Sequence, residues 1–143
     1  MSEGTWGDYQ YEIRGSKGDN RPYYFYFQMN NIGLIPAVRQ TQASAHRNPR
    51  ARKYNAQQGT IRDLVVLQMR ANGLNPAPAN LRLQARVQVR RKLTRSDVDN
   101  LLKAALDALQ GGPYENDLCI WEASVQKIKD ADESFSVELM EMK

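Results

Sequence analysis

Apolar and polar residues alternate most regularly between residues 81 and 90. One set is apolar: Leu81, Leu83, Ala85, Val87 and Val89. The other is polar: Arg82, Gln84, Arg86, Gln88 and Arg90. Strict alternation is typical of a strand with one buried face, so we predict a strand here with arginine and glutamine on its outer face. That face either follows DNA phosphates or is ordinary solvated strand surface, and the pattern favours neither.

Two segments repeat apolar residues at helical spacing. Ile61, Leu64, Val65 and Met69 share one face of a helix predicted over 54–71, which Asn72-Gly73 ends. The second predicted helix covers 97–109. Its apolar stripe consists of Val98, Leu101, Leu102, Ala105, Leu106 and Leu109.

The remaining segments complete an α+β fold with a small mixed β-sheet and two main helices packed on one face. Strands are predicted over the aromatic run 23–29 and over 118–128 and 134–142, whereas 39–53 reads as a mobile basic loop. Residues 1–21 are a polar N-terminal extension, either loose or an edge hairpin. Residues 22–143 form a single domain.

Composition narrows the class of protein. The chain has 143 residues, of which 41% are hydrophobic, as expected for one globular domain. A single cysteine, Cys119, excludes a disulfide framework and a cysteine zinc site within one chain. No secretory signal or membrane span is visible, so we expect a cytoplasmic protein with no membrane partner.

Charge is distributed unevenly along the chain. The net charge is +4, yet residues 39–95 carry thirteen Lys or Arg and only one acid, Asp63. Residues 97–143 carry four lysines and eleven acids. A segment as basic as 39–95 is typical of a polyanion-binding surface, since phosphate contacts release counterions. The alternative is a solvated basic face that pairs with the acidic C-terminal third.

An acidic group interrupts this pattern at residues 97–100. Asp97, Asp99 and Asn100 open the second predicted helix, with Lys103 one turn later and Asp117 beyond a Gly-Gly-Pro loop. One interpretation is structural: Ser96 and the acids form a capping box at the start of the helix. The other is chemical: two carboxylates at a helix start point towards one place and bind a metal ion, with Asp117 as a further ligand.

The pattern D-x-D-N-x-x-K at 97–103, then Asp107-Ala108-Leu109, Asp117 and Lys127, resembles RusA-type Holliday-junction resolvases. The resemblance covers about 81–127, and Ile35-Pro36 resembles the family more weakly. It implies a homodimeric endodeoxyribonuclease that needs Mg²⁺ (or Mn²⁺ in its place), uses no small-molecule cofactor and cuts four-way or branched DNA by paired symmetric nicks. Such enzymes are often encoded by phages. Asn116 departs from the family's paired acids, and the N-terminal extension is unusual.

The resemblance assigns roles to individual residues. Asp97, Asp99 and Asp117 are the expected metal ligands and are catalytic with Lys103, and Asn100 supports them. Metal-activated water then attacks phosphorus, while Lys103 stabilises the developing charge. The expected DNA-binding residues, with His46 as a loop residue near DNA, are Arg39, Arg47, Arg50, Arg52, Lys53, Arg82, Arg86, Arg90 and Lys127. Two alternatives stay open: a non-catalytic basic DNA-binding protein, and an interaction module whose basic face binds an acidic partner.

Overall fold

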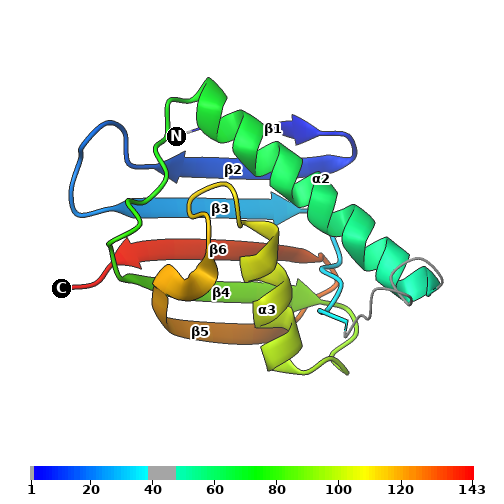
Figure 1. The fold of residues 1–143 in the computed structure, drawn as a ribbon. Coiled ribbons are helices and arrows are strands. Elements are labelled where there is room, and N and C mark those ends of the chain that lie inside the picture. Colours follow the sequence, from blue (N-terminus) through cyan, green and yellow to red (C-terminus); the bar gives the residue numbers. More distant parts are fainter. Residues whose placement is uncertain (1, 39–47) are drawn as a thin grey trace.

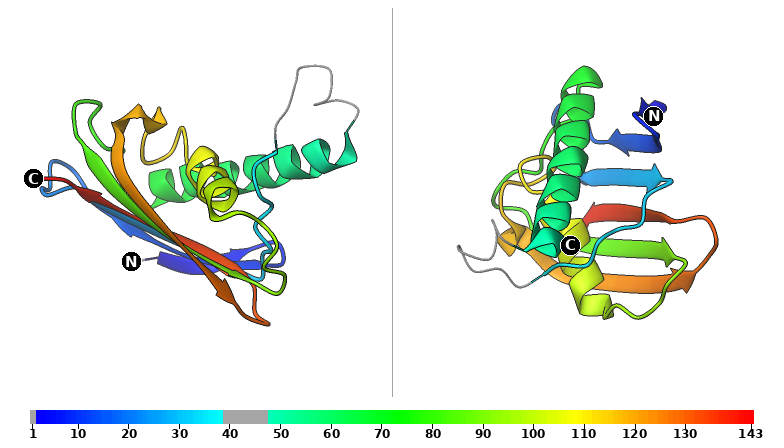
Figure 2. Two further views of the ribbon diagram at one scale, coloured as in Figure 1. Left: turned by 90° about the horizontal axis from the view of Figure 1, so that it is seen from below. Right: turned by 90° about the vertical axis from the view of Figure 1, so that its right-hand side faces the viewer.

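A six-stranded mixed sheet carries both helices on one face (Figures 1 and 2). This is a computed structural model, and it describes residues 2–38 and 48–143. The strands are β1 (Ser2–Trp6), β2 (Tyr9–Gly15), β3 (Tyr24–Asn30), β4 (Leu83–Arg91), β5 (Ile120–Lys129) and β6 (Ser134–Glu141). The helices are α2 (Pro49–Ala71), α3 (Val98–Ala108) and the short 3₁₀ helix η1 (Asp117–Cys119). The predicted fold class is confirmed.

The strand order is β1-β2-β3-β6-β4-β5, and every neighbouring pair is antiparallel except β4 and β5. Parallel neighbours require a crossover connection. The chain makes it through α3 and the following loop. β5 therefore begins at the same end of the sheet as β4, with Ile120 beside Leu83 and Lys129 beside Arg91.

The core lies between the sheet and the two helices. Alternate residues of β4 are buried as predicted, from Leu83 through Val89, while Arg82 and Arg86 are exposed on the opposite face. Between the helices, the buried amide of Gln58 in α2 donates to the carbonyl of Ala104 in α3 at 2.9 Å. This hydrogen bond fixes α3 against the first half of α2.

The starts of α2 and β5 differ from the predictions. α2 begins at Pro49, because the Asn48 side chain accepts from the amide of Arg50 and proline suits the first helical turn. Residues 49–53 are thus helical, and the loop prediction was wrong there. Residues 39–47 lie outside the described residues. Residues 117–119 form η1, so the strand predicted from 118 begins at Ile120.

The first fifteen residues contain a hairpin at the edge of the sheet. β1 pairs only with β2, and β2 pairs with β3. Tyr11 and Ile13 of β2 are buried in the common core. Of the two alternatives for this segment, the structure therefore has the edge hairpin.

Candidate functional site

Two acidic side chains stand at the start of α3 without protein partners. Asp97 is the N-cap residue, with extended backbone and no capping hydrogen bond from its side chain, and Asp99 lies in the first turn. Both are exposed, and neither forms an ion pair or side-chain hydrogen bond within the described chain. Both carboxylates are therefore available to a ligand.

The prediction that Ser96 caps this helix was wrong. Asp97 occupies the N-cap position, and the Ser96 hydroxyl instead accepts a hydrogen bond from the guanidinium of Arg91. Arg91 is the last residue of β4, so this bond ties the end of the strand to the turn before α3. The Arg91 Nε atom is buried and has no hydrogen-bond partner among the described residues.

Lys127 supports the same turn from the neighbouring strand. Its ammonium donates to the carbonyl oxygens of Thr94 at 2.6 Å and Ser96 at 2.9 Å. Lys127 was expected to bind DNA, and that contact stays a prediction. In the structure its ammonium donates to these backbone carbonyls, so it also positions the residues that lead to Asp97.

Lys103 and Asn100 lie one turn apart on α3. The Lys103 ammonium is 3.2 Å from a carboxylate oxygen of Asp107, and the lysine side chain is 63% exposed. It is paired with this acid and not with Asp99. The backbone carbonyl of Asn100 accepts from the amide of Ala37 at 3.0 Å, which holds the segment after β3 against the first turn of α3.

Asp117 is the first residue of η1, on the loop that leads into β5. The side chain of Asn116 accepts from the amide of Leu118 at 2.8 Å and caps this turn. Asn116 stands where the resembled family has an acid, and here its amide group has a local structural role. Asp117 itself is exposed.

The structure does not bring Asp117 together with Asp97 and Asp99 in one chain. Asp117 precedes the start of β5, whereas Lys127 fixes the turn before Asp97 near the end of β5. Figure 1 shows α3 starting at the lower edge of the sheet and η1, in orange, at the left. Within residues 2–38 and 48–143, no three His, Cys, Asp or Glu side chains are grouped so that they could hold one metal ion.

Three arginines in and just before β4 lie on the sheet face opposite the helices, and each has a contact: Arg82, Arg86 and Arg90. Arg90 is 3.0 Å from Asp130, and Arg86 is 4.0 Å from Glu138. The Arg82 guanidinium lies over the ring of Trp121, 5.3 Å from its centroid. Because α3 covers the other face, these arginines and the carboxylates of Asp97 and Asp99 belong to different sides of the sheet.

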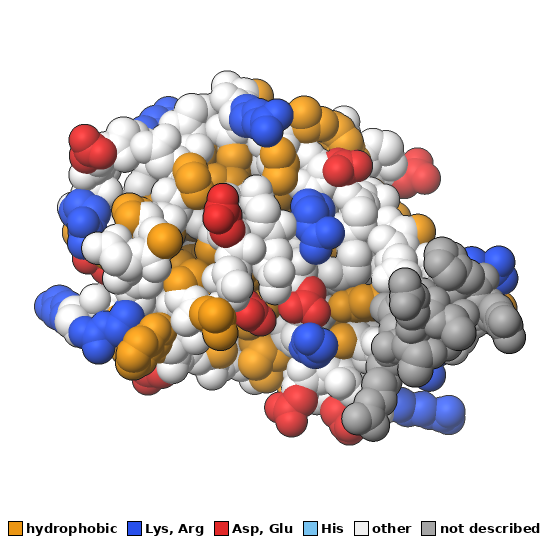
Figure 3. Space-filling view, in the orientation of Figure 1, with side chains coloured by type: hydrophobic (Ala, Val, Ile, Leu, Met, Phe, Trp, Pro, Cys, Tyr) orange, Lys and Arg blue, Asp and Glu red, His pale blue; other side chains and the backbone are white. Residues whose placement is uncertain are grey.

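A second basic group occupies the first turns of α2. Arg50, Arg52 and Lys53 are exposed, and none of them forms an ion pair with another described residue. In Figure 3, acidic side chains lie next to one another at the lower edge of the molecule, with basic side chains to either side. Arg39, His46 and Arg47 lie outside the described residues.

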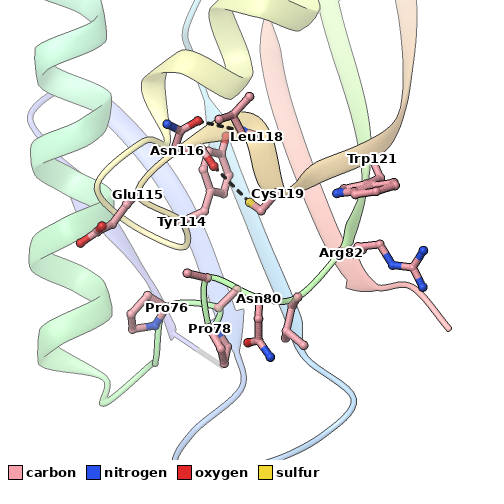
Figure 4. A pocket seen from close by; sticks show the side chains of 13 residues that line it. Pro76, Pro78, Asn80, Arg82, Tyr114, Glu115, Asn116, Leu118, Cys119 and Trp121 are labelled. Carbon is pink, nitrogen blue, oxygen red and sulfur yellow. Dashed lines mark hydrogen bonds between the residues drawn. The ribbon is translucent and has the colours of Figure 1, made fainter.

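A pocket of about 690 Å³ lies near Asp117 (Figure 4). Prolines 76 and 78 form one wall, and Trp121 and Tyr114 line it from other sides. Burial raises the pKa of Tyr114 well above its ordinary value, and its hydroxyl donates to the carbonyl of Leu106. Burial also raises the pKa of Cys119, whose thiol donates to the Asn116 carbonyl at 3.2 Å. These groups hold the loop in place, and the thiol is not activated as a nucleophile.

The chain matches a known family over most of its length. The model of the family described as endodeoxyribonuclease RusA matches residues 36–140. By class the protein is therefore an endodeoxyribonuclease, an enzyme. The chain belongs to the RusA family, whose members resolve Holliday junctions, act on branched DNA and generally depend on a divalent metal.

The match begins after β3, so the first three strands lie outside the matched residues. No curated protein matches the chain. Neither α2 nor α3 has the length and apolarity that a membrane-crossing helix requires. The resemblance to RusA-type resolvases, which the sequence motif indicated, is confirmed by the family match.

Sequence reasoning missed Arg91 as part of the site's support. A signal was present: the alternation of β4 ends in Arg90-Arg91-Lys92, where Arg91, the second of three consecutive bases, stands at the position that the period requires to be apolar. Such a break marks the residue that turns from the strand towards the next element.

Proposed function

We propose that this protein is a Mg²⁺-dependent Holliday junction resolvase that acts as a homodimer and makes paired, symmetric nicks. The observation that supports this most is the pair of exposed, unpartnered carboxylates, Asp97 and Asp99, at the start of α3 in a chain of the RusA family. Carboxylate oxygens are the ligands that Mg²⁺ prefers. We expect the enzyme to act in the cytoplasm of a bacterial or phage-infected cell.

The fit of a metal to one chain is incomplete. Asp97 and Asp99 supply two carboxylates, but Asp117 lies elsewhere and no third described acid joins them. We still assign all three as the metal-binding and catalytic acids, with Asn100 in support. The role of Asp117 then requires that it reach the other two from outside the chain that carries them.

Lys103 is the proposed cationic catalytic group. Its ammonium is largely exposed, and an exposed ion pair such as that with Asp107 is worth only about 0.3 to 0.5 kcal/mol. A bound phosphate can therefore compete for the lysine with little loss. Negative charge that develops on the phosphate during hydrolysis is stabilised by such a group.

The basic residues around α2 and β4 are proposed to hold the DNA backbone. Arg50, Arg52 and Lys53 are exposed without acidic partners and are immediately available to phosphate. Arg82, Arg86 and Arg90 must first leave their contacts. Lys127, together with Arg39 and Arg47 beyond the described residues, completes the proposed set.

The deciding experiment incubates the protein with a synthetic four-way junction and Mg²⁺, in parallel with Asp97→Asn. Asp63→Asn is the matched control, because Asp63 is an exposed acid on α2 away from the site. We expect symmetric nicks from the wild type and the control, and none from Asp97→Asn. Junction binding without cleavage in either Mg²⁺ or Mn²⁺ would instead identify a non-catalytic DNA-binding protein.

A further inference from the structure

The pocket near Asp117 is formed by two loops that enter the sheet side by side (Figure 4). Its lining comes from residues 76–82, which lead into β4, and from residues 114–121, which lead into β5. Because β4 and β5 are parallel, with Leu83 beside Ile120, both loops lie at the same end of the sheet. The volume of about 690 Å³ lies within the range of small-ligand sites, roughly 300 to 1,000 Å³.

Both walls of this pocket are held in place by the rest of the fold. The amide of Ala77 donates to the carbonyl of Pro113 at 2.7 Å, which joins the two loops directly. The hydroxyl of Tyr114 donates to a backbone carbonyl of α3. Prolines 76 and 78 restrict the backbone of the first loop. A ligand therefore meets a preformed site and orders little of the protein when it binds.

An aromatic ring stands open at the rim of the pocket. Trp121 is 65% exposed, and Leu118, which also lines the pocket, is 81% exposed. The guanidinium of Arg82 lies over the Trp121 ring and so helps to orient it. Arg82 forms no ion pair with a described acid, and Figure 4 shows Glu115 of the lining on the opposite side of the pocket. The charge of Arg82 is therefore available to an anion.

Asn80 contributes a polar group to the same lining. Its side chain forms no hydrogen bond within the described chain, and the residue is exposed. An amide offers both a donor and an acceptor, the combination that reads the hydrogen-bonding edge of a nucleobase. The pocket thus combines a stacking surface, an edge-reading group and, in Arg82, a cation for phosphate. Proteins bind unpaired nucleotides with these three kinds of group.

We propose that this pocket binds a nucleobase that has left the stack at the branch point of the DNA, with the base on Trp121, its edge on Asn80 and its phosphate on Arg82. The inference rests on the proposed function, because a junction supplies the base. Stacking is already interrupted where the arms of a junction meet, so extruding a base costs less there than within a duplex. Asp117 lies within the second loop, so a base bound here holds the DNA beside a proposed metal ligand.

Other occupants would behave differently. An apolar peptide or a second copy of the chain would also cover an exposed tryptophan. Neither of them needs an aromatic ring in place of a leucine at this position, and neither distinguishes a junction from a duplex. An experiment that varies both the side chain and the DNA therefore separates a nucleobase from these two occupants.

Junction binding in metal-free buffer tests the proposal without cleavage. We expect Trp121→Leu to weaken binding of a four-way junction about fivefold or more, since stacking of one base is worth roughly 5- to 100-fold in affinity. Trp121→Phe keeps a ring and should bind nearly as the wild type does. Neither variant should change binding to a plain duplex. Leu67→Ala truncates an exposed side chain on α2 and is the control, which should match the wild type on both DNAs.

Abasic nucleotides test whether the occupant is a base. A junction with abasic nucleotides at its branch point has no ring to stack, so wild-type affinity should fall about as far as Trp121→Leu lowers it on the intact junction. Both changes together should cost no more than one, because two groups in contact are not additive. Asn80→Ala should reduce the differences in affinity among junctions that carry different bases at the branch point.

The outcomes separate the base site from the proposed activity. Equal losses on junction and duplex, as the loss of a protein contact would produce, overturn the base site, and so does full additivity of Trp121→Leu and the abasic change. If either is found while the wild type cleaves junctions in Mg²⁺, the proposed activity stands. If the wild type never cleaves, yet the two changes are non-additive, the activity is wrong and the base site stands. A wild type that binds no junction overturns both.

Discussion

The ammonium of Lys127 in β5 lies 2.9 Å from the carbonyl oxygen of Ser96, the residue before the N-cap of α3. A second bond from the same ammonium reaches Thr94. Two strands and a helix meet at this point, since Arg91 of β4 also binds Ser96. The direction in which Asp97 and Asp99 project thus depends on a lysine thirty residues later in the chain.

Replacing Lys127 with Met should loosen this turn while leaving the fold intact. The expected loss is about 1 kcal/mol of unfolding free energy, since two partly exposed hydrogen bonds from a charged group are removed. Cleavage should fall more than tenfold as the carboxylates lose their orientation. Hydrogen exchange at the amides of residues 94–99, measured beside urea unfolding, should show the loosening.

Lys129→Met is the control for this change. It removes a lysine from the same strand, and Lys129 makes no such bonds within the described chain. If both variants reduce cleavage equally while exchange at 94–99 stays unchanged, Lys127 acts by contacting DNA and its positioning role is wrong.

A second prediction concerns the Lys103–Asp107 pair: removing the lysine should reduce cleavage but leave stability almost unchanged. Lys103→Met should change the unfolding free energy by less than about 0.5 kcal/mol, because the pair is exposed and four residues apart on a helix. Single-turnover cleavage of a bound junction should fall at least a hundredfold with junction affinity nearly unchanged.

Asp107→Asn completes the comparison, since it frees the lysine without removing it. We expect this variant to keep most of its cleavage rate. A loss as large as that of Lys103→Met would mean that the ion pair itself, and not the lysine, is required.

The pH dependence of stability should carry a contribution from the C-terminal strand. Hydrogen bonds from Arg21 and from the backbone amide of Tyr23 lower the pKa of Glu141 from 4.5 to about 2. A carboxylate whose pKa is lower in the folded state stabilises the fold above its unfolded pKa. This stabilisation should be complete above pH 4.5 and disappear as the pH falls towards 2.

Urea unfolding of the wild type and Glu141→Gln at a series of pH values measures this effect. The difference between them should be constant near neutral pH and shrink between pH 4.5 and 2. Arg21→Gln should remove most of the same pH dependence, because it removes the first cause of the shift. Parallel curves for the wild type and Glu141→Gln down to pH 2 would contradict the assignment.

Sequence periodicity was sufficient for β4 and α3, since both elements bury one regular face in the core. It failed for the helix cap, because nothing in the local sequence shows that Arg91 occupies the hydroxyl of Ser96. The start of α2 was missed for a different reason: residues 49–53 carry no apolar repeat, and only the Asn48-Pro49 cap marks it.

The position of Asp117 depends on topology. Twenty residues after Asp97, with a Gly-Gly-Pro loop between, it was expected to return to the same place. However, β4 and β5 are parallel, so the residues after the first strand and before the second lie towards opposite ends of the sheet. The family motif therefore supplied the candidate acids, and strand direction decides which of them lie close together in one chain.

The two basic groups should differ in how much each contributes to DNA affinity. Arg52 at the start of α2 has no acidic partner in the described chain, whereas Arg90 on β4 is 3.0 Å from Asp130. Each phosphate contact adds about 0.9 to the slope of log affinity against log salt. Arg52→Gln should therefore lower this slope by about one unit, and Arg90→Gln should change it much less.

Junction binding in metal-free buffer across a range of salt concentrations measures both slopes, with Asp97→Asn as the background so that no cleavage occurs. The comparison also decides the question that the alternation of β4 left open. If Arg90→Gln lowers the slope as much as Arg52→Gln, DNA contacts the open face of the sheet as well as α2. If it does not, the arginine face is solvated strand surface, and the DNA lies on the helix side where Asp97 and Asp99 project.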